Sequence, residues 1–160
     1  MPLVTVGCMA EDIFDSRPAR ALKADVPVML DRTRDEIGAI RALWPRFETL
    51  VGLRGRKMYA LVDESAGTYA ACTPVRAGDD PAGLGLETGV LPGGWYLQAR
   101  ITGEPPALYD RIGPAMTALE ARAIVDLGRP LVEYYRRHDQ VELWVPVFAA
   151  QARPRVTARA

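Results

Sequence analysis

Residues 131–147 read LVEYYRRHDQVELWVPV, two apolar runs separated by the polar stretch 136–140. This pattern predicts a β-hairpin, because strand residues alternate between two faces while the turn between strands stays polar. In the second run aliphatic residues recur at every other position, which predicts one face packed into a core: Val141, Leu143, Val145 and Val147. The hairpin therefore indicates a sheet protein, and the other elements can be placed relative to it.

Two carboxylates and two large aromatic residues also stand at alternate positions of this hairpin. Glu133 and Tyr135 share a face of the first strand, and Glu142 and Trp144 share the non-aliphatic face of the second. We interpret the four side chains as one face of the hairpin. Such a face is either solvated, as charged strand faces usually are, or it is the wall of a cavity whose acids and rings suit an organic cation. Both interpretations stay open at this point.

Length and charge narrow the class of protein. The chain has 160 residues, of which 20 are basic and 20 acidic, so we expect one domain or two small fused modules. Balanced charge gives no basic field for nucleic acid. The sequence has neither an 18-residue apolar run nor a basic segment ahead of its first apolar residues, so it predicts no membrane span and no signal peptide. We therefore expect a cytoplasmic protein that contacts neither membrane nor, by itself, nucleic acid.

The sequence offers little material for a metal or a cofactor. Cys8 and Cys72 lack metal-ligand spacing and are expected to be small buried residues in a reducing compartment. His138 is the one histidine and lies in the predicted turn, so it cannot build a histidine metal site or a serine-type triad. The glycines of the segment 83–94 do not precede a helix with phosphate-loop spacing. We expect no cofactor and no metal.

Hydrophobic spacing predicts the elements that precede the hairpin. In the first half these are a strand over 17–28, a helix from an N-cap at Asp31 or Thr33 to about Leu50, strands over 57–62 and 69–75, and a loop-rich segment over 77–94. In the second half they are a strand over 95–101 and a helix opened by Glu104, Pro105 and Pro106 and ended by Gly128 and Pro130. Pro45 and Pro114 fall inside the helical patterns, where proline should kink a helix or end it early.

The order of elements in the first half recurs in the second. The sequence DEIG at 35–38 returns as DRIG at 110–113, and YAACTPV at 69–75 returns as VELWVPV at 141–147. Two recurrences in the same order indicate an internal duplication of a βαββ module. One such module exposes too much apolar sheet to stand alone, so we expect an α+β fold in which two modules pair, with antiparallel sheets, helices on one face and a cleft between the modules.

At these residues the sequence resembles the GyrI-like domain, also called the bacterial transcription-activator effector-binding domain. The resemblance covers about residues 17–147 and depends on the tandem order, the LPGG at 91–94, the helix around 109–113 and the ending ELWVPV at 142–147. It implies two βαββ modules about a pseudo-two-fold axis with a ligand cleft between them. Multidrug-sensing members bind bulky aromatic cations there through glutamates on the last two strands and through aromatic residues. Some stand-alone members hydrolyse cyclopropane-bearing DNA alkylators, and some are named for inhibiting DNA gyrase.

By position, the resemblance assigns Glu142 and Trp144 to the last strand of the site, where a tyrosine is commoner than Trp144, and Glu133 and Tyr135 to the strand before it. In an enzyme of this kind, Glu142 and Tyr135 would be the catalytic residues. The corresponding first-module positions are small, which leaves room for a ligand. The full set of ligand-binding candidates is Glu133, Tyr135, Glu142, Trp144, Tyr59, Leu61, Trp44 and Cys72.

These observations predict an N-terminal extension over 1–16 that could include a short strand, a GyrI-like domain over 17–150 and a basic tail over 151–160. The modules are expected at about 17–76 and 88–148. We expect a monomer or homodimer without a DNA-binding segment ahead of residue 17. It should bind bulky hydrophobic, often cationic molecules, as multidrug-binding and xenobiotic-resistance proteins do. Hydrolysis of cyclopropane-bearing molecules is the alternative, and gyrase inhibition ranks third because zero net charge gives no DNA-like acidic field.

Overall fold

The structure is a computed structural model that describes residues 13–149. The predicted short strand at Leu3, Val4 and Val6, the thiol of Cys8 and the predicted tail over 151–160 lie outside the described residues. Of the predicted extension, Asp15 N donates to Arg100 O at 2.7 Å, and Ser16 Oγ accepts from Arg100 N at 2.8 Å. Residues 13–16 therefore run beside the strand that contains Arg100.

Ten elements follow one another in two similar halves. The first half contains β1 (Ala19–Lys23), β2 (Val26–Arg34), α1 (Ile37–Val51), β3 (Met58–Asp63) and β4 (Thr68–Pro74). The second contains β5 (Glu87–Leu91), β6 (Gly94–Thr102), α2 (Ala107–Glu120), β7 (Leu131–Arg137) and β8 (Gln140–Pro146). Each half is thus ββαββ, one strand more than the predicted module. Neither helix of residues 13–149 is long and apolar enough to cross a membrane.

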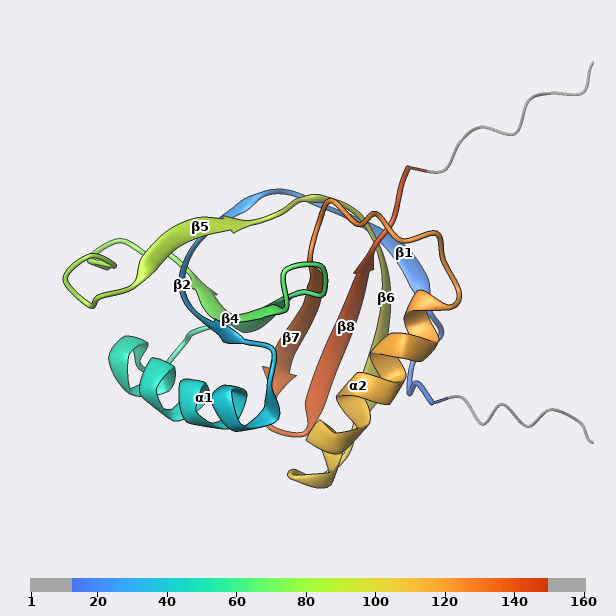
Figure 1. The fold of residues 1–160 in the computed structure, drawn as a ribbon, viewed down its shortest axis with the longest axis horizontal. Coiled ribbons are helices and arrows are strands. Elements are labelled where there is room, and N and C mark those ends of the chain that lie inside the picture. Colours follow the sequence, from blue (N-terminus) through green and yellow to red (C-terminus); the bar gives the residue numbers. More distant parts are fainter. Residues whose placement is uncertain (1–12, 150–160) are drawn as a thin grey trace, which may run out of the picture.

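The strands form one antiparallel sheet in the order β1-β6-β8-β7-β3-β4-β2-β5. Replacing each strand with its counterpart in the other half reverses this order, which is the signature of the predicted pseudo-two-fold axis. The predicted α+β tandem fold is confirmed, although the modules share one sheet. The halves meet where β3 pairs with β7, and each first strand crosses over, since β1 pairs with β6 and β5 with β2. Figure 1 shows the sheet curled into a half-barrel with both helices on its outer side.

Both faces of the curled sheet are apolar. Against the outer face, the helices bury Leu43 and Phe47 from α1 and Leu108 and Leu119 from α2. The inner face is covered by no helix; its buried cluster consists of strand residues only, namely Val28, Leu30, Tyr59, Ala70, Cys72, Leu91, Tyr96, Val132 and Trp144. The sheet therefore has a helix-covered core on one side and an aromatic-rich concavity on the other.

The first half departs from the predicted elements at its first strand and at its helix. Residues 17–28 belong to two strands separated at Ala24 and Asp25, not one. β2 then continues through Arg34 because its residues pair with β4, Asp31 opposite Ala71. The proposed helix caps thus lie in a strand, and the helix N-cap is Glu36.

Neither internal proline ends its helix. α1 continues beyond Pro45 to Val51, and α2 continues beyond Pro114 to Glu120. In α1 the residues on either side of the proline, Leu43 and Phe47, are buried, and burial of such side chains contributes about 1.5–3 kcal/mol each, enough to offset a missing hydrogen bond. α2 nevertheless ends before the predicted stop at Gly128. The sequence also missed β5, a short edge strand inside the segment predicted as loop.

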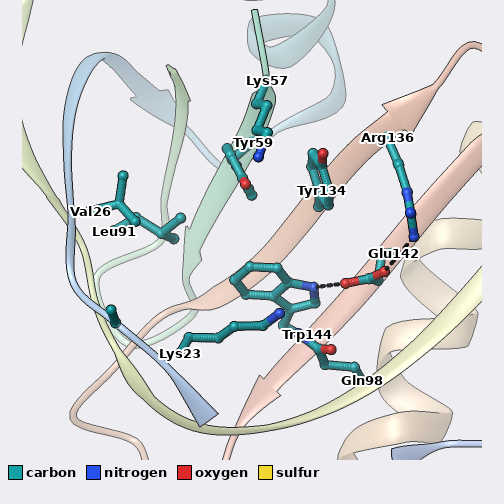
Figure 2. A pocket seen from close by; sticks show the side chains of 11 residues that line it. Lys23, Val26, Lys57, Tyr59, Leu91, Gln98, Tyr134, Arg136, Glu142 and Trp144 are labelled. Atoms are coloured by element: carbon teal, nitrogen blue, oxygen red, sulfur yellow. Dashed lines mark hydrogen bonds and ion pairs between the residues drawn. The ribbon is translucent and has the colours of Figure 1, made fainter. Parts of the chain in front are cut away.

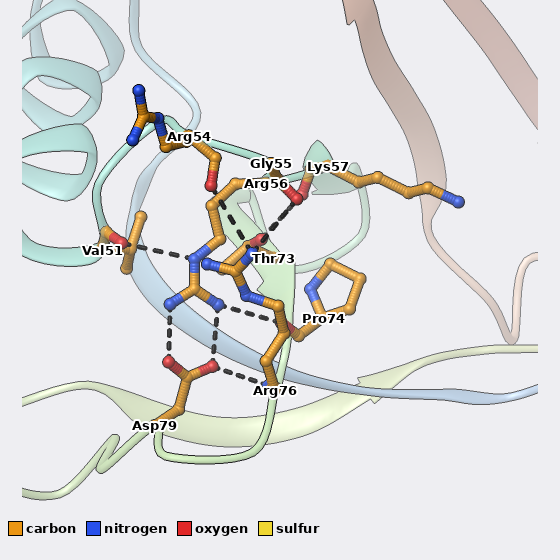
Figure 3. A network of polar contacts seen from close by, with 9 residues as sticks. All are labelled: Val51, Arg54, Gly55, Arg56, Lys57, Thr73, Pro74, Arg76 and Asp79. Atoms are coloured by element: carbon orange, nitrogen blue, oxygen red, sulfur yellow. Dashed lines mark hydrogen bonds and ion pairs between the residues drawn. The ribbon is translucent and has the colours of Figure 1, made fainter.

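A buried ion pair fixes the connection between the halves (Figure 3). Arg56 Nη1 and Nη2 donate to the two oxygens of Asp79 at 2.7 and 2.6 Å, and both side chains are largely buried. Arg56 also donates to Val51 O at the end of α1, and Asp79 accepts from Arg76 N at 2.6 Å. The pair thus joins the end of α1 to the segment that leads to β5. Hydrogen bonds from Arg56 hold the pKa of Asp79 well below its usual range.

We expect Asp79→Asn to lower the midpoint of thermal unfolding, because it leaves the buried Arg56 guanidinium without its charged partner. The wild-type pKa is depressed, so the stabilising effect of Asp79 is present above its usual pKa and is lost as the pH falls below it. Melting curves at pH 7 measure the loss. Asp80→Asn is the matched control, since Asp80 is exposed and its side chain accepts from the Gly83 amide in its own turn. Equal midpoints for both variants would contradict this role.

Candidate functional site

The hairpin presents its two glutamates to opposite sides of the sheet, so the predicted single face is wrong. Tyr134 lies opposite Glu142, whereas Glu133 lies opposite Leu143. Residues directly opposite one another in an antiparallel pair share a face. Glu142 and Trp144 therefore lie on the inner face with Tyr134, and Glu133 and Tyr135 lie on the outer face among the helices.

On the outer face, Glu133 and Tyr135 belong to an acid–aromatic cluster of Trp44, Tyr69, Tyr109, Glu133 and Tyr135. Tyr135 Oη donates to Glu133 Oε1 at 2.7 Å, and Tyr69 Oη donates to the same oxygen at 3.3 Å. Trp44 Nε1 donates to Tyr69 Oη at 2.9 Å. The Trp44 and Tyr109 rings meet Tyr135 edge-on, with centroids 5.0 and 6.4 Å away. One carboxyl is thus enclosed by side chains from α1, β4, α2 and β7.

The position of the cluster follows from the packing of the helices. α1 packs on β2 and β4, and α2 packs on β6 and β8, so each helix covers its own half. Glu133 lies between them on β7, next to the seam with β3. Its sheet neighbours on that side are small, Ala60 directly opposite and Ala71 one strand further. Trp44 and Tyr135 are half-buried and Tyr109 is 47% exposed, so the rings separate Glu133 from solvent.

Burial controls the protonation of Glu133. The residue is 7% exposed, and desolvation raises the pKa of its carboxyl to about 7 even though the bonds from Tyr135 and Tyr69 favour the carboxylate. Among residues 13–149, no lysine or arginine forms an ion pair with it. Burial, followed by the charge of Glu133, raises the pKa of Tyr69 and Tyr135 well above the usual value, so both phenols stay protonated donors. Near neutral pH the cluster can take up either a proton or an external cation.

The inner face holds a half-open cavity of about 440 Å³ (Figure 2). Tyr59 from β3 and Tyr134 from β7 are stacked there, with centroids 4.5 Å apart and an interplanar angle of 16°. The Trp144 ring meets Tyr59 edge-on at 5.7 Å. Burial, followed by the neighbouring Tyr134, raises the pKa of Tyr59 to about 12. Three aromatic rings from both halves thus wall the cavity.

Glu142 is the one carboxylate of residues 13–149 that lines the cavity, and it is already engaged. Glu142 Oε1 accepts from Trp144 Nε1 at 2.6 Å, and its Oε2 lies 3.8 Å from Arg136 Nη1. Lys23 and Lys57 also line the cavity. The described part of the chain therefore contributes three cationic side chains and one carboxylate to the cavity, the reverse of the acidic cleft that the sequence predicted.

The structure thus divides the predicted site residues into two groups. Glu133, Tyr135 and Trp44 meet on the outer face, and Glu142, Trp144 and Tyr59 line the inner cavity. The predicted catalytic pair, Glu142 with Tyr135, is wrong because the sheet separates the two side chains.

Leu61 and Cys72 lie on the inner face without lining the cavity. Cys72 is fully buried, and burial raises the pKa of its thiol to about 12. Within residues 13–149 no three His, Cys, Asp or Glu side chains are grouped to hold a metal ion.

The binding candidates predicted from the sequence did not include Tyr69 and Tyr109 of the cluster or Tyr134, Lys23 and Lys57 of the cavity. Tyr134 could have been found, because the predicted five-residue turn already places Tyr135 opposite Val141 and hence Tyr134 opposite Glu142. The other contacts join residues far apart in the chain and need the tertiary fold.

The curled eight-stranded sheet with two helices on its outer side is a fold like that of GyrI-like domains. No family model and no curated protein sequence matches the chain. Among solved structures, it is similar to the integron cassette protein VCH_CASS2 from the mobile metagenome of Vibrio cholerae, with a TM-score of 0.66 and 22% identity over 84% of this chain and 97% of that one.

It is also similar to SAV2435 bound to tetraphenylphosphonium, with a TM-score of 0.62 and 15% identity over 82% of this chain and 94% of that one. The chain is similar as well to the EcmrR C-terminal domain, with a TM-score of 0.58 and 14% identity over 84% of this chain and 98% of that one. At these identities the likeness establishes the fold alone.

Proposed function

We propose that the chain binds bulky, hydrophobic, aromatic small molecules, and that lipophilic cations bind at the acid–aromatic cluster between α1 and α2. One observation carries this proposal: Glu133 is a buried carboxyl that has aromatic neighbours and no cationic partner among residues 13–149. The tetraphenylphosphonium bound by SAV2435, a protein with the same fold, supports this ligand class.

Differences in hydration favour the pairing of a buried carboxylate with a lipophilic cation. A buried carboxylate has lost several kcal/mol of hydration, and a partner charge can restore this. A delocalised cation is weakly hydrated, so it gives up little on entering an apolar site. Contacts with the rings of Trp44, Tyr69 and Tyr135 add about 0.5–2 kcal/mol each. Because rings accept many shapes, tolerance of chemically unrelated ligands follows, as in multidrug binding and xenobiotic resistance.

The rings of the cluster contact one another, so a ligand has to part them. Trp44 belongs to α1 and Tyr109 to α2, and the two helices pack on different strands. The ligand can therefore enter at the seam by displacing Tyr109, which is the most exposed member of the cluster. Ala60 and Ala71 keep the sheet surface on the β3 side of Glu133 low, whereas Leu143 lies directly opposite Glu133 on the β8 side.

Titration of the wild-type chain with tetraphenylphosphonium and with triphenylphosphine oxide, its neutral relative, tests the proposal. Cation affinity should rise up to about tenfold between pH 6 and pH 8, because a carboxyl with a pKa of about 7 passes from mostly protonated to mostly ionised. Affinity for the neutral compound should stay constant. Isothermal titration calorimetry measures both, and a cation affinity independent of pH would refute the role of Glu133.

A second candidate function is hydrolysis of reactive cyclopropane-bearing molecules, with Glu133 in place of the predicted Glu142. The observation that favours it is the 2.7 Å contact between a carboxyl with a pKa of about 7 and the Tyr135 phenol, a base and a proton donor side by side. Mass spectrometry of a cyclopropane-bearing alkylator after incubation decides: ring-opened product above the Glu133→Gln background supports hydrolysis, and its absence across several substrates excludes it.

A further inference from the structure

The two lysines of the chain line the same cavity. The sequence has 20 basic residues, and only Lys23 and Lys57 are lysines. Both line the inner-face cavity, one from the end of β1 and the other from the residue before β3 (Figure 2). Lys23 Nζ lies 4.9 Å from the centroid of the Trp144 ring. None of the carboxylates of residues 13–149 forms an ion pair with either lysine.

The cavity contains a further polar side chain, and its nitrogen has no hydrogen-bond partner among the described residues. Gln98 lines the cavity from β6, beside Trp144, and its Nε2 is the one buried side-chain nitrogen or oxygen of the described residues without a hydrogen-bond partner. A buried donor without an acceptor is costly, and in native proteins it is usually satisfied by water or by a ligand. The cavity therefore offers two cationic donors, of which Lys57 is exposed and Lys23 half-buried, and one buried neutral donor that has no acceptor among the described residues.

The charges of the cavity select the sign of a ligand. Glu142 already accepts from Trp144 and lies near Arg136, so within residues 13–149 no carboxylate pairs with either lysine. A cation in this space would meet like charges, whereas an anion would pair with the lysines. The stacked rings of Tyr59 and Tyr134, with Trp144 across from them, form flat apolar walls for an aromatic ring.

We propose that this cavity is a second binding site, specific for a planar aromatic molecule that carries an anionic group such as a carboxylate or sulfonate. The rings hold the aromatic part, and Lys23 and Lys57 hold the anionic group. The sheet separates this site from Glu133, so the chain presents a cation-binding outer face and an anion-binding inner face. The two sites make opposite demands on charge, and each can be tested without the other.

A matched pair of fluorescent probes tests the proposal: 8-anilinonaphthalene-1-sulfonate and N-phenyl-1-naphthylamine, which lacks the sulfonate. We expect the wild type to bind the anion more tightly than the neutral probe. Lys23→Gln and Lys57→Gln should each weaken the anion about three- to tenfold, the effect of removing one partly desolvated ion pair, and leave the neutral probe unchanged. Glu142→Gln should strengthen the anion about two- to fivefold, because it removes a like charge.

Arg41→Gln, on the exposed surface of α1, removes one positive charge away from the cavity and is the control for net charge.

Acylation of the lysine amines supplies a second readout, which needs no comparison of affinities between variants. The anionic probe should slow acylation of Lys23 and Lys57, mapped by mass spectrometry, and tetraphenylphosphonium should not. Equal loss of anion binding in Arg41→Gln, or unchanged acylation under saturating anion, would overturn the proposal; circular dichroism of each variant verifies folding.

Discussion

Glu133→Gln is expected to weaken the binding of tetraphenylphosphonium by roughly 30-fold or more, while triphenylphosphine oxide binds as it does to the wild type. The substitution keeps the shape of the side chain and an oxygen that can accept from Tyr135 and Tyr69. It removes only the charge that a buried cation would pair with. Removal of one partner from a desolvated charge pair typically costs about 2 kcal/mol or more, roughly 30-fold in affinity.

The hairpin supplies its own control. Glu142→Gln makes the same chemical change on the other face, where the carboxylate already accepts from Trp144. It should leave the affinity for tetraphenylphosphonium within about twofold, because the sheet lies between Glu142 and the outer cluster. Calorimetric titration of both variants at pH 8 compares them. A larger loss of cation affinity in Glu142→Gln than in Glu133→Gln would move the cation site to the inner face.

The free energy of unfolding of the wild type should fall relative to that of Glu133→Gln by about 3 kcal/mol as the pH rises from 4.5 to 7. The carboxyl has a pKa of about 7 in the folded chain and its ordinary value of 4.5 in the unfolded chain. The folded state therefore binds the proton more tightly. The contribution of Glu133 to the free energy of unfolding is therefore greatest below pH 4.5, where the carboxyl is protonated in both states, and it declines until the carboxyl has ionised in both states above pH 7.

Urea unfolding across this pH range measures the free energy of unfolding of the wild type and of Glu133→Gln. The contributions of all other titrating groups cancel in the difference between the two proteins. The side-chain amide that the substitution introduces does not titrate, so any cost of finding it an acceptor is the same at every pH. Such a cost shifts the curve without changing its slope. Parallel curves for the two proteins would show that Glu133 is no more desolvated than an ordinary surface carboxyl.

The elements and their duplication could be predicted because they depend on local pattern. The spacing of apolar residues predicted the hairpin over 131–147, the strands over 57–62 and 69–75 and a helix that ends at about Leu50. The structure confirms these elements, with the helix ending at Val51. β5 could not be predicted in this way. It is a five-residue edge strand among turn residues, and its pairing with β2 becomes available only when the halves exchange strands.

The site was harder to predict, because a sheet that is apolar on both faces does not reveal which face binds. Glu133 and Glu142 both have aromatic neighbours, so residue type cannot separate them. The contact of Trp44 with Tyr69 depends on how α1 rests on the sheet, and the proximity of Lys23 to Lys57 depends on β1 joining the other half. These relations join distant parts of the chain and follow from the strand order.

That strand order also constrains how such a chain can arise. Because β1 completes the sheet of the second half and β5 completes that of the first, each half lends one strand to the other. A single half, made as a separate polypeptide, would have left its second strand without the neighbour that it has in the full sheet. Two copies of that half could pair these strands by exchanging their first strands. The present chain has the topology that two copies of such a half would form by exchanging their first strands. In one covalent chain the two halves need not be identical, so the Glu133–Tyr135 pair on β7 and Lys23 at the end of β1 need no counterpart in the other half.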